Sequence, residues 1–210
     1  ATALVVKKWM DIGEVNYEAL GFNAQRVIRD AGEPLDGREE MIRSGKTNLT
    51  RIAVSAMEKA VPTADVVLLN SGSIRVDDIL QMPITEYDII RTLPYGGSIM
   101  EVDMKGSLLI KTLEAGRNNV GSGGFLQYSS AVNYNPQTKV WTLNEKSIDP
   151  KKIYHVGLAD FLMTGGEANM SFLNKDNPDI IKIYPTSTNT SDLRSDSRLA
   201  IIKYMLELGK

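Results

Sequence analysis

The sequence predicts an α+β fold, a single compact domain with a mixed β-sheet and packed helices. Segments with the apolar pattern of strands are interspersed with segments whose apolar residues recur at helical spacing. The chain has 210 residues, and a domain near this size removes roughly 70% of its unfolded surface from water. It contains no internal repeat, low-complexity segment or Pro- or Ser-rich linker. We therefore expect one domain that spans residues 1–210.

The N-terminal quarter of the chain predicts two helices separated by a short extended segment. The stretch up to about Met10 is amphipathic, and we expect it to be the end of a connecting helix. Residues 17–28 have strand character, and residues 32–38 are typical of a turn. Apolar residues then recur at helical spacing over 49–60, which predicts a helix with Asn48 as its N-cap.

The middle of the chain predicts a buried strand, a capped helix and a second strand. The continuous apolar run over residues 66–69 is typical of a buried strand. Thr85, followed by acidic residues, is a good helix start, because acids favour the positive end of a helix. That helix must end before Pro94, because the residue before a proline avoids the helical conformation. Alternation over residues 100–104 predicts another strand.

The C-terminal half predicts a helix, a hairpin, a strand and a closing helix. The first helix is expected over residues 107–115, with Gly116 closing it in a left-handed conformation. The later elements are expected as hairpin strands over 128–134 and 139–143, a strand over 153–161 and a closing helix over 192–208.

Composition excludes several classes of protein. The net charge is −2, which argues against a nucleic-acid polymer as partner, since such binding needs a basic face. Cysteine is absent, so a disulfide framework and a cysteine-based metal site are both excluded. No apolar run approaches the roughly 20 residues of a membrane span, and we predict none.

Only one histidine is present, His155. A di-metal phosphoesterase centre requires several histidines together with carboxylates, so the sequence predicts no metal ligands in this chain. A catalytic triad on His155 has no nucleophile motif beside it, and the alternation around it favours a structural or surface role. The segment 43–47 resembles a phosphate loop, but Glu40 stands where its first glycine is required, which excludes that motif.

Three turns carry the best candidates for a binding site. Asn70 and Arg75 follow the buried strand, Tyr95 and Phe161 each lie shortly before a pair of glycines, and Glu167 directly follows such a pair. A solvated turn, two core aromatics and a solvated acid are the structural alternatives. Together, however, one cation, two rings and one acid suit a small ligand with a phosphate, a flat base and a sugar diol.

An ordered series of motifs resembles the C-terminal domain of the 5′-nucleotidase / UDP-sugar hydrolase / 2′,3′-cyclic phosphodiesterase family. The turn Leu69-Asn70-Ser71-Gly72-Ser73-Ile74-Arg75 is similar to that family's Asn-Gly-Gly-Gly-Ile-Arg. The other pieces are Leu35-Asp36-Gly37-Arg38 with Arg43 and Thr47-Asn48-Leu49, Ile84-Thr85, Leu93-Pro94-Tyr95-Gly96-Gly97, Met104-Lys105-Gly106, Gly123-Gly124-Phe125-Leu126-Gln127 and Gly165-Gly166-Glu167.

The resemblance implies a 5′-nucleotidase C-terminal-domain-like fold that binds the nucleotide or nucleoside substrate. An N-terminal metallophosphoesterase domain of the same polypeptide, absent from this chain, would hold two divalent metal ions and carry out hydrolysis. The resemblance further implies a periplasmic or extracellular location and no catalytic residue here. By position, Asn70 and Arg75 would contact the nucleotide, Tyr95 and Phe161 would clamp the base, Glu167 would take the ribose, and Arg43 would contact phosphate.

Several departures from the family pattern leave a second hypothesis open. Gly45 and Lys46 replace Arg and Glu, Thr50-Arg51 replaces Gly-Asn, and Gly97 and Glu167 replace Asn and Asp. Gly97 removes an amide able to bind a base edge, and Lys46 or Arg51 compensates for the absent arginine only if it points inward. The alternative is therefore a non-catalytic binding or interaction module that retains the fold with a drifted pocket.

Overall fold

The computed structural model describes residues 2–208, apart from the side chains at positions 3 and 10. Its centre is a five-stranded mixed sheet, as the sequence predicts. Strands β11 and β3 run parallel, and the other neighbouring pairs are antiparallel. In spatial order the strands are β12 (Ile180–Ile183), β6 (Ile99–Lys105), β11 (Ile153–Ala159), β3 (Val66–Asn70) and β7 (Leu126–Tyr128).

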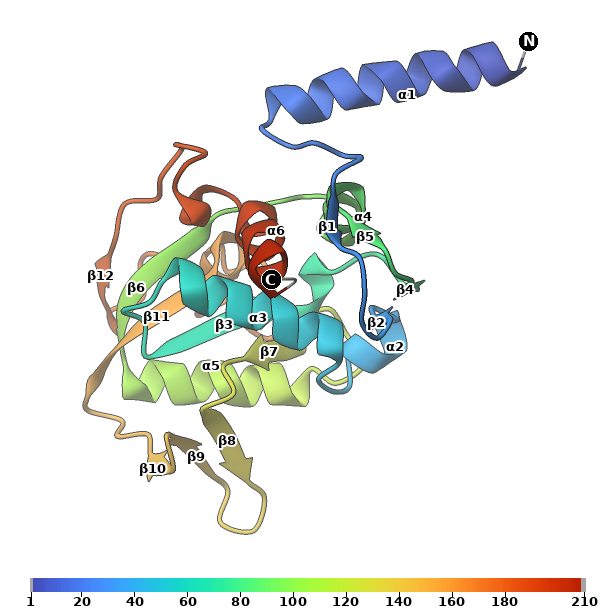
Figure 1. Ribbon diagram of the computed structural model, residues 1–210. Coiled ribbons are helices and arrows are strands. Elements are labelled where there is room, and N and C mark those ends of the chain that lie inside the picture. The colour runs from blue at the N-terminus through green and yellow to red at the C-terminus, as the bar shows by residue number, and fades with distance from the viewer. Residues whose placement is uncertain (1, 209–210) are drawn as a thin grey trace.

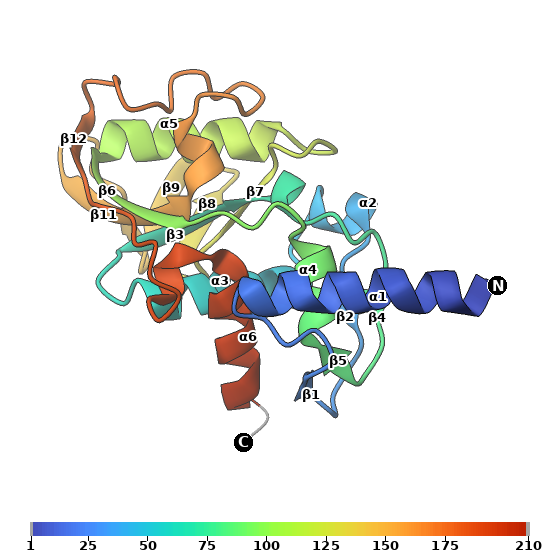
Figure 2. The same ribbon diagram turned by 90° about the horizontal axis from the view of Figure 1, so that it is seen from above.

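Helices cover both faces of this sheet (Figures 1 and 2). Val66 and Leu68 of β3 point into a core on the side of α5, whereas Val67 and Leu69 point into a core on the side of α3 and α6. Successive side chains of a strand alternate between faces, so a strand buried on both sides needs an unbroken apolar run. The covering helices are α3 (Asn48–Ala60), α5 (Gly106–Asn118) and α6 (Ser197–Leu208).

Two helices begin at capping boxes. Thr85 caps α4 (Glu86–Thr92) together with Asp88, as predicted, and the helix ends before Pro94. Helix α3 begins one residue earlier than predicted, because Thr47 is its N-cap. Asn48 instead binds a neighbouring segment: its side chain accepts from the Asp36 backbone N–H at 2.8 Å and donates to the Pro34 carbonyl at 2.8 Å.

Helix α5 continues through Gly116 to Asn118, so the predicted helix end at Gly116 is wrong. Gly116 lies inside the helix, at a point where the helix packs closely against the sheet. A Cβ atom built there would lie 2.4 Å from the Cγ atom of Leu126, which is fully buried in β7. The glycine therefore lets helix and sheet approach closely, and Asn119 caps the helix instead.

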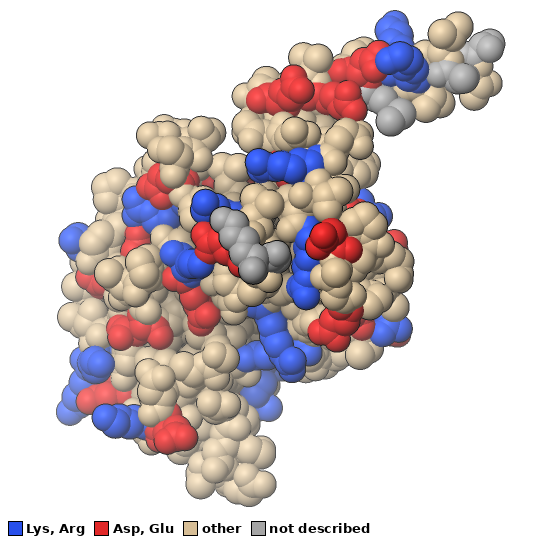
Figure 3. Space-filling model, viewed as in Figure 1, with Lys and Arg blue, Asp and Glu red and all other residues tan. Residues whose placement is uncertain are grey.

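Further predictions differ from the structure in their boundaries. The strand expected over 153–161 ends at Ala159, because residues 160–163 form a 3-10 helix. Helix α1 (Thr2–Ala19) is longer than predicted and projects from the body (Figures 1 and 3). It takes up the first residues of the predicted 17–28 strand, of which only β1 (Val27–Arg29) is extended, paired with β5 (Ile84–Thr85). The predicted closing helix is divided into the 3-10 helix η3 (Leu193–Ser195) and α6.

Smaller strand pairs complete the fold. The predicted hairpin is present only in part. The strand expected over 128–134 is divided between β7 of the central sheet and residues 132–135 of an antiparallel meander, in which Trp141 is buried against Tyr128 and Tyr134. The short elements are β2 (Leu35–Asp36) paired with β4 (Ile79–Leu80), the meander β8 (Val132–Asn135), β9 (Val140–Leu143) and β10 (Lys146–Ser147), and helix α2 (Glu39–Ile42). Among the described helices, none is both long and apolar enough to cross a membrane.

Candidate functional site

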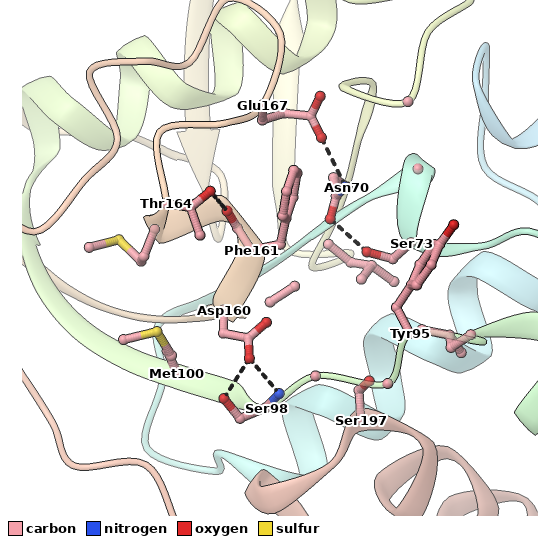
Figure 4. A pocket seen from close by; sticks show the side chains of 18 of the residues that line it. Asn70, Ser73, Tyr95, Ser98, Met100, Asp160, Phe161, Thr164, Glu167 and Ser197 are labelled. Carbon is pink, nitrogen blue, oxygen red and sulfur yellow. Dashed lines mark hydrogen bonds between the residues drawn. The ribbon is translucent and has the colours of Figure 1, made fainter.

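One large cavity opens at the carboxyl ends of β3 and β11. Its volume is about 1090 Å³, and its walls come from the turns after these two strands, the turn after α4, and the start of α6. Five of the six predicted site residues line it: Asn70, Arg75, Tyr95, Phe161 and Glu167. Figure 4 shows four of them around the same opening. The fold thus brings together side chains up to 97 residues apart in the sequence.

Asn70 anchors one wall of the cavity. Its side chain is 3% exposed; its Nδ2 atom donates to Glu167 Oε2 at 2.9 Å, and its Oδ1 atom accepts from Ser73 Oγ at 2.7 Å. The other Glu167 oxygen accepts from the Ala168 backbone N–H at 2.8 Å. Glu167 is therefore held in place by two hydrogen bonds while it still lines the cavity, which pre-positions its carboxylate for a polar ligand group.

The turn after Asn70 is packed directly against the loop before β7. The Gly72 N–H donates to the Gly123 carbonyl at 2.7 Å. A Cβ atom at Gly72 would lie 3.1 Å from the Gly123 Cα atom. Glycine at both positions therefore permits this close approach without crowding.

Tyr95 and Phe161 present open ring faces at the cavity. Tyr95 is 78% exposed and Phe161 is 45% exposed, so neither ring belongs to the hydrophobic core. Within residues 2–208 the two rings make no stacking contact with each other. In Figure 4 they stand on either side of the Asn70–Ser73 turn. A flat group between them would gain roughly 1–3 kcal/mol per stacked ring.

The turn that carries Tyr95 is held by the C-terminal helix. Gly96 and Gly97 have φ values of +61° and +105°, a conformation that favours glycine. The Gly97 carbonyl accepts from the Ser197 N–H at 2.9 Å. A Cβ atom at Gly96 would lie 2.7 Å from the guanidinium of Arg198. Tyr95 is therefore placed by contacts that are distant in sequence.

Asp160 is a cavity residue that the sequence prediction missed. It begins the 3-10 helix η2 (Asp160–Met163) and lines the cavity next to Phe161. Its Oδ2 atom accepts from both the N–H and the hydroxyl of Ser98, each at 2.9 Å. The predicted strand over 153–161 placed Asp160 inside the strand, whereas β11 ends at Ala159 and the Ser98 contact holds Asp160 at the rim.

Two cations border the cavity. Arg75 and Lys175 are both exposed cavity-lining residues. Within the part of the chain that the structure describes, neither side chain makes an ion pair or hydrogen bond. A guanidinium with five unused donors is suited to a phosphate group.

Arg43 does not line the cavity. Its guanidinium pairs with Glu39 at 2.7 Å on the short helix α2, and its Nε atom is buried without a hydrogen-bond partner among the described residues. Its carbonyl accepts from the Gly121 N–H at 2.8 Å, so its backbone supports the loop behind the Gly72–Gly123 contact. The phosphate role predicted for Arg43 stays a prediction.

Lys46 and Arg51 do not point into the cavity either. Lys46 lies 3.8 Å from the centre of the Tyr128 ring and donates to the Tyr128 carbonyl at 3.1 Å. Burial, reinforced by the charge of Arg51, lowers the pKa of Lys46. Both residues line a separate pocket of about 170 Å³. Gly45 stands where the family pattern has an arginine, and neither Lys46 nor Arg51 supplies a replacement charge at the main cavity.

His155 belongs to an ionic network on β6 and β11. Its Nδ1 atom lies 2.7 Å from Asp103 Oδ1, and its Nε2 atom lies 2.9 Å from Glu101 Oε2. Glu101 also pairs with Arg194, and Asp103 accepts from Tyr184 at 3.0 Å. Burial opposes the charged imidazolium, but hydrogen bonds to both carboxylates outweigh it and raise the pKa of His155. His155 is not a cavity-lining residue.

The described residues contain no group of three or more histidine, aspartate or glutamate side chains arranged to hold a metal ion. The cavity is lined instead by two exposed rings, two hydrogen-bonded carboxylates, a buried amide and two cations.

Comparison with known proteins identifies the family of this domain. The chain belongs to the 5′-nucleotidase C-terminal domain family, whose model matches residues 27–174. Protein UshA of Yersinia enterocolitica is 32% identical over 137 residues, which cover 63% of this chain and 24% of the relative. The chain thus matches about a quarter of that relative's length.

Solved structures share the fold. The 5′-nucleotidase precursor from Thermus thermophilus matches with a TM-score of 0.74 over 99% of this chain and 40% of its own, at 21% identity. The NAD nucleotidase of Haemophilus influenzae matches with a TM-score of 0.67 over 97% of this chain and 39% of its own, at 21% identity. The predicted fold class and family resemblance are confirmed.

Proposed function

We propose that this domain binds a nucleoside or nucleotide and positions it for phosphoester hydrolysis by an N-terminal dimetal domain of the same polypeptide. One observation carries the proposal: two exposed rings, a fixed carboxylate and a free guanidinium, from separate turns, line one cavity. Membership of the 5′-nucleotidase family supports a nucleotide as ligand. From membership of this family alone, we also propose a periplasmic or extracellular location.

Each side chain has a separate role in this proposal. The base lies between Tyr95 and Phe161, and Asn70 binds at its side. Arg75 binds the phosphate through charge-assisted hydrogen bonds. Glu167 accepts hydrogen bonds from the ribose diol, because each of its oxygens accepts one protein hydrogen bond and has a further lone pair available.

The chemistry itself is assigned to the other domain. Two divalent metal ions there would activate the attacking water and stabilise charge on the phosphoryl group. This chain contributes by holding the substrate in a fixed orientation, and such positioning supplies a large share of many rate enhancements.

Calorimetry with adenosine, AMP and a UDP-sugar tests the proposal. We expect saturable binding that is lost or at least about tenfold weaker in Tyr95→Ala and Phe161→Ala, since each removes a stacking ring. Tyr87→Ala is the matched control, because Tyr87 is an exposed tyrosine that packs against Tyr17 outside the cavity. Equal binding by all three variants would show that the ligand site lies elsewhere.

A second candidate is a non-catalytic binding or interaction module with a drifted pocket. The observation that favours it is that Lys46 and Arg51 are turned away from the cavity, while Gly97 provides no side-chain amide there. The same calorimetry separates the two candidates, because a drifted pocket is expected to bind none of the three ligands.

A further inference from the structure

Asp160 lies where the two ring-bearing turns meet. It directly precedes Phe161, and its backbone N–H donates to the Ser98 carbonyl at 3.1 Å. Its carboxylate in turn holds Ser98, three residues after Tyr95, through two hydrogen bonds of 2.9 Å. Figure 4 shows the carboxylate between Phe161 and Ser98. The carboxylate therefore lies on the cavity wall beside Phe161 and is bonded to the segment that follows Tyr95.

Only one oxygen of this carboxylate is engaged. Both Ser98 bonds reach Oδ2, and Oδ1 has no hydrogen-bond partner among residues 2–208. Asp160 is a partly exposed cavity-lining residue. Oδ1 is thus a pre-positioned hydrogen-bond acceptor on the cavity wall.

Gly97 keeps this oxygen open. A Cβ atom at position 97 would lie 2.9 Å from Asp160 Oδ1, so any larger residue would crowd or cover it. The φ value of +105° also favours glycine at this position. Glycine in place of the family's asparagine at position 97 therefore removes a side-chain amide from the cavity and leaves Asp160 Oδ1 uncovered.

We propose that Asp160 makes the site selective for bases that carry an exocyclic amino group. This inference rests on the proposed function, because it assumes that the base lies between Tyr95 and Phe161. A base in that gap presents an edge to Asp160 Oδ1. An ionised carboxylate only accepts hydrogen bonds, so an amino group on that edge is bound, whereas a carbonyl would place two acceptors against each other.

The size of the effect follows from the kind of bond. A hydrogen bond to a charged group corresponds to about a tenfold to hundredfold change in affinity. Oδ1 does not need to move to make it, because Ser98 already fixes the carboxylate. The selectivity should therefore appear in binding of neutral nucleosides, without any phosphate.

Calorimetry with adenosine and purine riboside tests this directly, because the two nucleosides differ only in the amino group. We expect the protein to bind adenosine at least about tenfold more tightly. In Asp160→Asn the amide oxygen can still accept from Ser98, and the amide N–H then faces the cavity. This variant should lose the preference for adenosine and bind inosine, which carries a carbonyl, about tenfold more tightly than the unmodified protein does.

Asp30→Asn is the control for the change in net charge, since Asp30 is exposed and lies outside the cavity. If adenosine and purine riboside bind equally, or if Asp160→Asn retains the preference, the inference is wrong. In that case, loss of both ligands in Phe161→Ala would leave the proposed function intact. If no nucleoside binds in a saturable way, both the inference and the proposed function fail.

Discussion

The hydrogen bond between Asn70 and Glu167 is a sensitive point of the cavity, and Asn70→Asp tests it. The change replaces the Nδ2 donor, 2.9 Å from the Glu167 carboxylate, by a second carboxylate oxygen. Asn70 is buried but Glu167 is partly exposed at the cavity, so solvent screens the two groups only in part. The bond to Ser73 is preserved, because Oδ1 already accepts there.

The variant can accommodate the two adjacent carboxyl groups in two ways, and the one that costs less free energy sets the loss of stability. If both carboxylates stay charged, their repulsion at about 3 Å is roughly 5 kcal/mol at an effective dielectric constant of 20, and a hydrogen bond is lost as well. The alternative is proton uptake by the pair, which costs about 1.4 kcal/mol per pH unit above a carboxyl pKa of about 4. Proton uptake is the cheaper route, and it predicts a loss of about 4 kcal/mol at pH 7.

Proton uptake by the pair determines how the stability of Asn70→Asp changes with pH. The folded variant binds a proton that the unfolded chain releases above about pH 4, so its stability falls as the pH rises. We expect a deficit of only about 1.4 kcal/mol at pH 5. Adding Glu167→Gln to Asn70→Asp should recover most of the loss, because the new amide can donate across the same contact.

Urea denaturation followed by circular dichroism at pH 5 and pH 7 measures these differences. Asn118→Asp is the control, since Asn118 donates to Glu114 at 3.4 Å on the exposed surface, where solvent limits the cost to under about 1 kcal/mol. A deficit that does not change with pH, or that persists in the double variant, would show that the contact is not a buried hydrogen bond.

Three further predictions concern the body of the domain. Gly116→Ala should lower stability by about 2 kcal/mol in urea denaturation, because overpacking against Leu126 exceeds the gain in helix propensity, whereas Gly13→Ala on α1 should cause no loss. The difference in stability between the unmodified protein and His155→Gln should be full below about pH 6.5 and disappear at higher pH, because the folded-state pKa of His155 is raised. The purified chain should show no metal-dependent hydrolysis of AMP in a phosphate-release assay. Measurable turnover would contradict the proposal that hydrolysis takes place in the N-terminal domain.

Much of the fold could be predicted from local patterns. The strand at 66–69 and the helix that Thr85 begins are encoded in a few neighbouring residues, and the structure confirms both. The end of α5 could not be predicted in this way. Gly116 is a plausible helix terminator by itself, and only its contact with Leu126 shows why the helix continues.

In the candidate site, too, some residues could be predicted from the sequence and others depend on contacts that are distant in the chain. Motif order was enough to select Asn70, Arg75, Tyr95, Phe161 and Glu167, which line one cavity, although their binding roles stay predictions. Asp160 was missed because its position depends on Ser98, which is 62 residues away. Short-range periodicity contains no information about such a contact.

Helix α6 has a practical consequence for defining the smallest functional fragment. Ser197 forms part of the cavity wall and holds the turn of Tyr95 through Gly97, yet it lies beyond residue 174, where the family match ends. A fragment trimmed to the matched region would retain all the recognisable motifs but lose the support behind one aromatic ring. Expression boundaries for ligand screening or crystallisation should therefore include the whole of α6.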